Sequence, residues 1–224
     1  MTGSLWKSYA KTPLAIRASI ALLVTLAFLL VPAPLDHWTY THAYHRNLYD
    51  LDWARMLRLV GWWPAWVLAA LALWLHRRAV DAALARRHAL LLALSPAVSA
   101  LLCEVLKLLI RRERPDVGAG DWVFRAWSEH TFSTSGLATP SSHTMVAFAA
   151  ATLAARLFPR LRWVLYALAW GCAVTRVLSH AHFLSDATLG AVLGWAVGWG
   201  MWIEWGEARV KRATDRPKSQ VQAS

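Results

Sequence analysis

The feature that most constrains the fold is a series of six long apolar stretches separated by short charged segments. The hydrocarbon core of a bilayer is about 30 Å thick, so a helix needs on the order of 20 apolar residues to cross it. Hydrophobic residues make up 57% of the chain, which is more than a soluble protein of this size needs. We therefore predict an all-α, polytopic membrane protein built as a six-transmembrane-helix bundle. The predicted helices span approximately residues 14–31, 57–75, 89–110, 143–157, 163–179 and 187–205.

The length of 224 residues indicates one domain rather than two. We assign residues 1–210 to a single transmembrane domain and residues 211–224 to a polar cytoplasmic tail that is predicted to be disordered. The stretch at 14–31 is longer than the apolar region of a cleaved signal peptide, and no clear small-residue cleavage site follows it. We expect it to be an uncleaved first helix.

The positive charges predict the orientation of the bundle. The net charge of +11 lies in short clusters between apolar stretches, which is typical of contact with anionic membrane lipids and not of nucleic-acid binding. Cytoplasmic loops carry an excess of Lys and Arg. This rule predicts a multi-pass protein of the cell (inner) membrane, with both termini cytoplasmic and the segments 32–56, 111–142 and 180–186 on the external or periplasmic face. The larger, cytoplasmic group comprises Lys7, Lys11, Arg77, Arg78, Arg86, Arg87, Arg156, Arg160, Arg162, Arg209, Lys211, Arg212, Arg216 and Lys218.

The first chemically unusual segment is Lys107 to Pro115, at the external end of the third apolar stretch. On a continuous helix Lys107 and Arg114 fall on nearly the same face, with Glu104 and Arg111 beside them and Pro115 ending the helix. Two cations that face a bundle interior suit a phosphate dianion. Taken alone, the pattern is more typical of basic side chains that reach from a helix end toward water.

The second segment is Pro140-Ser141-Ser142-His143, directly before the fourth stretch. A serine in this position predicts a helix cap, and the free N–H groups of a helix start bind anions. His143 in the first turn can supply a proton. The plain alternative is a capped helix with an incidental histidine.

The third segment joins the fifth and sixth stretches and contains Arg176, His182 and Asp186. Because His182 and Asp186 are four residues apart, they meet if both lie on one helix. A carboxylate bonded to one imidazole nitrogen fixes the tautomer and leaves the other nitrogen as a base or nucleophile. A single His/Asp residue pair of this kind, without other motifs, is more often structural.

The three segments gain weight together because loop charges alone assign all of them to one membrane face. They supply three cations, a helix N-terminus, a proton donor and an oriented nucleophile, which are the components of phosphoryl transfer without a metal. His37, His42 and His45 in the first external loop lack a thiol or carboxylate that would complete a metal site. We expect no metal and no cofactor.

These motifs resemble those of a known family. Lys107-x6-Arg114-Pro115, Pro140-Ser141-Ser142-His143 and Arg176-x5-His182-x3-Asp186 are similar to the three signatures of the type 2 phosphatidic acid phosphatase superfamily. That superfamily includes lipid phosphatases, glucose-6-phosphatase and the vanadium haloperoxidases. The resemblance covers about residues 89–200. Ser142 stands where the family usually has Gly, and Thr175 where it usually has Ser.

The resemblance implies a role for each motif residue. His182 would be the nucleophile that forms a phosphohistidine, Asp186 would orient it, and His143 would be the acid and base. The remaining motif residues would hold the phosphoryl oxygens, namely Lys107, Arg114, Ser141, Ser142 through its amide, and Arg176.

Several functions remain open at this stage. The expected enzyme hydrolyses a lipid phosphate monoester or pyrophosphate, with phosphatidate, phosphatidylglycerol phosphate, polyprenyl pyrophosphate and lipid A phosphate all compatible. A phosphotransferase that uses the same pocket and a non-catalytic lipid-binding protein are the alternatives. A haloperoxidase would share the pocket, but the hydrophobic stretches favour a membrane enzyme.

Overall fold

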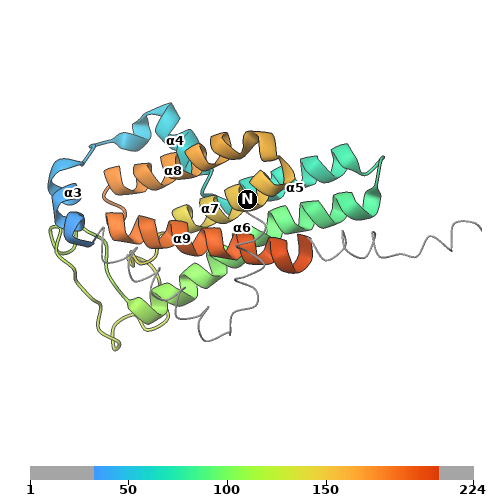
Figure 1. Ribbon diagram of the computed structural model, residues 1–224. Helices are drawn as coiled ribbons and strands as arrows, with labels where there is room; N and C mark the ends of the chain where they lie inside the picture. The colour runs from blue at the N-terminus through green and yellow to red at the C-terminus, as the bar shows by residue number, and fades with distance from the viewer. Residues whose placement is uncertain (1–32, 207–224) are drawn as a thin grey trace, which may run out of the picture.

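The computed structural model describes residues 33–206, and over this range the chain is all-α (Figure 1). The predicted first helix at 14–31 and the tail at 211–224 lie outside the described residues. Seven α-helices carry the labels of Figure 1: α3 (Asp36–His42), α4 (Asp52–Leu59), α5 (Trp63–Arg77), α6 (Ala82–Ile110), α7 (Ser142–Leu157), α8 (Arg162–Leu178) and α9 (Leu184–Met201).

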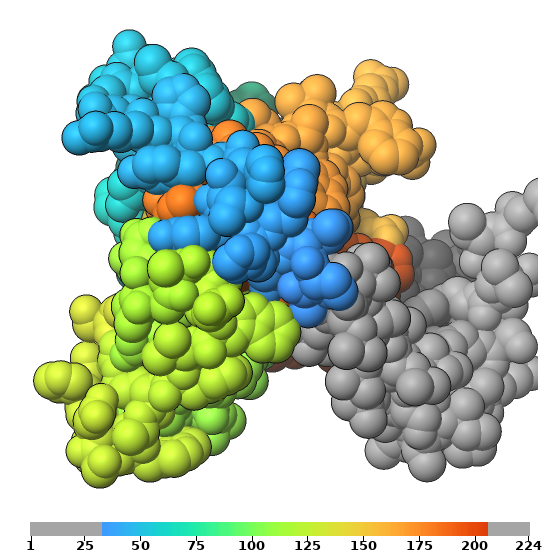
Figure 2. Space-filling model, turned by 90° about the vertical axis from the view of Figure 1, so that its left-hand side faces the viewer, coloured from blue at the N-terminus to red at the C-terminus, as the bar shows by residue number. Residues whose placement is uncertain are grey.

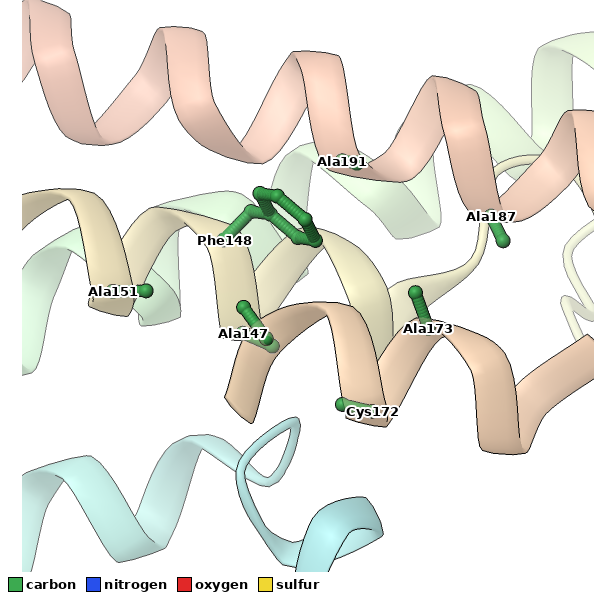
Figure 3. Close-up of a cluster of buried hydrophobic side chains, with 8 residues drawn as sticks. Ala147, Phe148, Ala151, Cys172, Ala173, Ala187 and Ala191 are labelled. Carbon is green, nitrogen blue, oxygen red and sulfur yellow. The ribbon is translucent and has the colours of Figure 1, made fainter. Parts of the chain in front are cut away.

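Helix α7 lies at the centre of the bundle and packs against α6, α8 and α9. Nearly every side chain of its middle turns is buried, and many of these are alanines. Small residues allow helix backbones to approach closely, which is a common way for membrane helices to associate. Figure 3 shows this core, in which Phe148 is the one large labelled side chain among alanines and Cys172.

The stripe of Gly190, Gly194 and Gly198 forms the close contact of α9 with α7. A Cβ added at Gly194 would lie 2.1 Å from the carbonyl O of Met145, and one at Gly198 would lie 2.6 Å from that of Ala149. Any larger residue at these positions would push the two helices apart.

Two helices differ from the sequence-based expectation. The stretch predicted as one helix over 57–75 is broken into α4 and α5, which meet at an angle of 70°. The hydropathy pattern did not reveal this bend, because hydropathy reports the polarity of a segment and not its direction. Helix α6 ends at Ile110, where Arg111 adopts a left-handed conformation (φ 59°), and not at Pro115.

The described helices include candidate membrane spans. By length and composition, Ala82–Ile110 and Pro159–Leu178 can each cross a bilayer, and the bent pair α4–α5 makes a third if it counts as one span. Large apolar side chains are exposed on the outside of the bundle, as expected for contact with lipid: Leu68, Leu101, Leu109 and Trp163 are each at least 60% exposed. The chain is a membrane protein.

One end of the bundle is covered by α3 and by the segment 111–141 (Figure 1). Figure 2 looks onto this end, where α3 (blue) lies between the residues around α4 (cyan) and those that follow α6 (lime). The opposite end contains the turn between α5 and α6. The three motif segments all lie near the covered end, and the two ends of the bundle therefore differ in chemistry.

Candidate active site

The end of α6 is connected to the start of α7 through Lys107. This side chain is only 8% exposed, and its Nζ donates to Ser142 Oγ at 2.6 Å and to Glu104 Oε1 at 3.1 Å. Ser142 in turn donates to the same Glu104 oxygen at 3.1 Å. Lys107, Ser142 and Glu104 thus form a closed hydrogen-bonded ring between the first two motifs.

Arg114 lies beyond the end of α6, so the expectation that it shares a helical face with Lys107 is wrong. Its backbone N–H donates to the carbonyl of Gly136, and its side chain is exposed. Arg111 does not contribute to an anion site, because it donates to the carbonyls of Arg125, Ala126 and Glu129 and so holds the segment 111–141 together.

Ser141 and Ser142 begin α7, but not by the predicted side-chain cap. Ser141 occupies the N-cap position without a capping hydrogen bond, and its hydroxyl accepts from Thr144 at 3.0 Å. Its backbone N–H donates to the carbonyl of Asp186 at 3.2 Å, which joins the start of α7 to the start of α9. Ser142 is an ordinary helical residue, so the position where the family usually has Gly carries no strain here.

His143 lies in the first turn of α7 against the bend between α4 and α5. A Cβ added at Gly61 would lie 2.7 Å from the Cβ of His143 and 2.5 Å from its carbonyl O. Only glycine permits this approach, and the bend therefore covers one side of the histidine.

Arg176, near the end of α8, is buried and held by Tyr49. One guanidinium nitrogen donates to the Tyr49 hydroxyl at 2.9 Å, and that hydroxyl donates to the carbonyl of Thr175 at 3.2 Å. Nε of Arg176 is buried without a hydrogen-bond partner among residues 33–206. A buried donor without a partner is costly, and a phosphate oxygen would satisfy it.

His182 lies in the turn between α8 and α9, not on one helix with Asp186 as predicted. Its Nδ1 donates to the carbonyl of Ala138 at 2.8 Å, while Asp186 Oδ2 is 4.0 Å from the same nitrogen. The backbone carbonyl therefore makes the orienting hydrogen bond, and the carboxylate lies behind it as a nearby charge. Burial, together with the positive charges of Arg176, Lys107 and Arg114, lowers the pKa of His182 well below its usual range.

Asp186 is fully buried in the first turn of α9 and accepts several hydrogen bonds. The Phe183 N–H donates to its Oδ2 at 2.8 Å, and the Thr139 hydroxyl and the Arg112 guanidinium donate to its Oδ1. The carboxylate thus joins the start of α9 to the segment that precedes α7.

No three His, Cys, Asp or Glu side chains within residues 33–206 are grouped as metal ligands would be. The cations Lys107, Arg114 and Arg176 act together on His182, which is the chemistry of an anion site.

A sequence profile described as the PAP2 superfamily matches residues 88–209, more than half of the chain and all three motifs. The chain belongs to the PAP2 superfamily. The family assignment made from the motifs is thereby confirmed.

The bundle is also similar to a solved PAP2 structure. That crystal structure is described as the first transmembrane PAP2 type phosphatidylglycerolphosphate phosphatase from Bacillus subtilis. The similarity has a TM-score of 0.62 at 19% identity and covers 84% of this chain and 96% of the other. At this identity the similarity concerns the fold. A comparison with curated proteins gives no match.

Several residues of this PAP2 site were not singled out as site residues by the sequence. Tyr49 and Gly61 come from the region before the motifs, and Arg112 lies in the segment predicted to be external, where the sequence indicated no role of its own for it. The Ala138 carbonyl carries no residue-type signal, because any residue offers one. Glu104 was noted beside Lys107, but nothing in the sequence indicated its bond to Ser142.

Proposed function

We propose that this PAP2 protein is an integral membrane phosphatase that hydrolyses a lipid phosphate monoester or pyrophosphate through a phosphohistidine, without a metal. The observation that carries the proposal is the hydrogen bond from His182 Nδ1 to the Ala138 carbonyl. A carbonyl can only accept, so Nδ1 bears the proton and Nε2 keeps its lone pair. The lowered pKa of His182 also favours the neutral, nucleophilic imidazole.

The electrostatics around His182 favour a phosphoryl group as the target. Lys107, Arg114 and Arg176 all act on the imidazole as positive charges. A phosphoryl transition state spreads negative charge over three oxygens, and fixed cations stabilise it. The Nε donor of Arg176, the Ser141 hydroxyl and the Ser142 amide at the start of α7 complete the set.

The reaction has two steps in this proposal. His182 Nε2 first attacks phosphorus, the bond from phosphorus to the lipid oxygen breaks, and His143 gives that oxygen its proton. A water molecule then gives a proton to His143 and attacks phosphorus, the N–P bond breaks, and phosphate leaves. Asp186 stabilises the positive charge that the imidazole carries while it is phosphorylated.

The same proposal includes the arrangement in the membrane. We infer one domain over residues 1–210 with six spans, in which α4–α5, α6, α7, α8 and α9 follow the helix predicted at 14–31. We infer that the end covered by α3 and segment 111–141 is the external face, which gives the site access to headgroups of the outer leaflet. Both termini are then cytoplasmic.

A phosphate-release assay with purified protein in detergent tests the function. The substrate panel contains phosphatidate, phosphatidylglycerol phosphate, a polyprenyl pyrophosphate and lipid A phosphate. We expect release from at least one of them and complete loss with His182→Ala, while His45→Ala, at an exposed external histidine, keeps full activity.

Other outcomes of this assay discriminate the alternatives. Transfer of phosphate to a second lipid without release to water would make the protein a phosphotransferase. Lipid binding without release or transfer would make it a non-catalytic lipid-binding protein. Activity that survives in His182→Ala would exclude this residue as the nucleophile.

A further inference from the structure

A buried charge cluster lies behind His182, and the proposed chemistry uses only one of its members, Asp186. It consists of Asp36 from α3, Arg112 from the segment after α6, and Asp186 from α9, which are 1%, 5% and 0% exposed. Burying three charges is costly unless they are paired and hydrogen-bonded. Such a cluster at the back of a nucleophile therefore needs an explanation.

Arg112 is the centre of this cluster. Its Nε donates to the Thr139 hydroxyl at 2.6 Å, and one terminal nitrogen donates to Ser185 Oγ at 2.8 Å and to Asp186 Oδ1. Its backbone carbonyl accepts from the Ala138 N–H at 2.7 Å. Ala138 is the residue whose carbonyl orients His182, so Arg112 fixes both the group that binds the imidazole and the carboxylate behind it.

Asp36 lies on the other side of Arg112, with Oδ2 at 3.6 Å from a guanidinium nitrogen. It accepts from the Ser185 N–H at 2.8 Å, from the Ser185 hydroxyl at 2.5 Å and from Trp122 Nε1 at 3.1 Å. Burial raises the pKa of Asp36, while the Ser185 hydrogen bonds and the charge of Arg112 oppose that shift. The charge of Asp186 adds to the upward shift. The hydrogen-bond partners Ser185 and Trp122 are donors, however, and together with Arg112 they favour the ionised carboxylate.

The net charge of the cluster matters for His182. Arg112 alone would neutralise Asp186 and leave no net charge for the imidazole. Asp36 supplies a second negative charge, so that two carboxylates and one guanidinium leave one net negative charge near His182. When Nε2 bonds to phosphorus and Nδ1 keeps its proton, the ring becomes cationic, and this net charge stabilises it.

We propose that Asp36 and Arg112 are positioning residues for His182. Arg112 fixes Ala138 and Asp186, and Asp36 offsets the positive charge of Arg112, so that the negative charge of Asp186 still acts on the imidazole. This inference rests on the proposed phosphohistidine chemistry. It also gives α3 a role. Asp36, in the first turn of α3, accepts from Ser185 at the start of α9, and α3 thereby helps to hold the residues behind His182.

The test compares Asp36→Asn, Arg112→Gln and Arg112→Lys in the full-length protein in detergent. We expect Asp36→Asn to lower kcat on the order of 10- to 100-fold with KM within about threefold, because the phosphate-binding side chains are unchanged. The acid limb of its kcat/KM profile moves to lower pH, because the imidazolium loses a stabilising charge. Arg112→Lys recovers part of the kcat that Arg112→Gln loses.

Glu113→Gln is the matched control, because it breaks the Glu113–Arg125 pair of the same external segment, at 2.7 Å, without contact to Asp186 or His182. Its kcat and acid limb stay at the wild-type values. Thermal unfolding is measured for every variant. If Asp36→Asn fails to fold, the comparison of Arg112→Gln with Arg112→Lys tests the positioning role instead.

Two results would overturn the inference alone: a wild-type kcat in folded Asp36→Asn, or an equal loss of kcat in Glu113→Gln. Wild-type protein that releases no phosphate from any lipid would instead overturn the proposed function, and the inference with it. The two failures are therefore distinguishable.

Discussion

The imidazole of His182 is held by a backbone carbonyl on one side and surrounded by cations on the other. The carbonyl of Ala138 fixes the tautomer, and Lys107, Arg114 and Arg176 disfavour a second proton. A nucleophile in such surroundings needs no general base of its own, because it is already neutral at physiological pH.

The first prediction concerns the pH dependence of activity. Because the folded-state pKa of His182 is lowered from 6.5, the imidazole protonates only as the pH falls through that lowered value. The acid limb of kcat/KM, corrected for ionisation of the substrate phosphate, should therefore lie below pH 6.5. Below pH 6.5 the unfolded state binds more protons at this residue, so this histidine also lowers fold stability as the pH falls.

A titration of phosphate release between pH 4 and 9 checks this expectation. An acid limb at or above pH 6.5 would mean that burial and the surrounding cations do not lower the pKa of His182 as the structure indicates.

At the residue scale, charged side chains were predictable and backbone groups were not. Lys107 and His182 stand out in an apolar sequence because a charge is costly there. Ala138 contributes only its carbonyl, and the pairing of Arg112 with Asp36 joins positions far apart in the sequence. Asp186 was expected to bond directly to His182, but spacing alone could not show that a helix begins between them.

At the scale of elements, the bend between α4 and α5 contributes a wall of the site. Hydropathy predicted one straight helix, because it measures polarity and not direction. The bend brings Gly61 against His143 and leaves no room for a side chain. Likewise, helical periodicity extended α6 to Arg114, because no Gly or Pro marks the left-handed residue at Arg111.

The second prediction follows from this contact. Gly61→Ala would force the bend away from the start of α7 and displace His143, and small displacements of a catalytic group cost roughly 10- to 100-fold in rate. We expect kcat to fall in this range in the phosphate-release assay.

Gly200→Ala is the matched control, since a Cβ at Gly200 in α9 meets nothing within 4 Å. This change should leave kcat unaltered and raise the melting temperature slightly, because Ala favours a helix over Gly. Equal activity of the two variants would show that the bend does not support His143.

At the scale of the whole molecule, the two ends of the bundle differ in the charge of their connections. The connections at the end opposite the site carry Arg77, Arg78, Arg86, Arg160 and Arg162, which is the pattern of a cytoplasmic surface. The order and type of the later helices could be predicted from hydropathy. The convergence of their ends could only be inferred from the shared chemistry of the motifs.

The third prediction tests this orientation by cysteine labelling in intact cells. Phe132→Cys, in the external segment, should react with a membrane-impermeant maleimide, since residue 132 is 90% exposed. Val80→Cys, between α5 and α6 and 93% exposed, should react only after the membrane is permeabilised.

The native Cys103 and Cys172 are buried, so the unaltered protein serves as the background control. Labelling of residue 80 in sealed cells, without labelling of residue 132, would invert the proposed topology.

The ring formed by Glu104, Lys107 and Ser142 has a consequence for selectivity within a bilayer. An open cationic pocket at a membrane surface would be occupied continuously by the singly charged headgroups of abundant lipids. Here an incoming anion must compete with the carboxylate that already neutralises Lys107. A phosphate with two charges gains more from that exchange than a phosphodiester with one, so we expect the resting site to discriminate against the bulk lipid before any bond is broken.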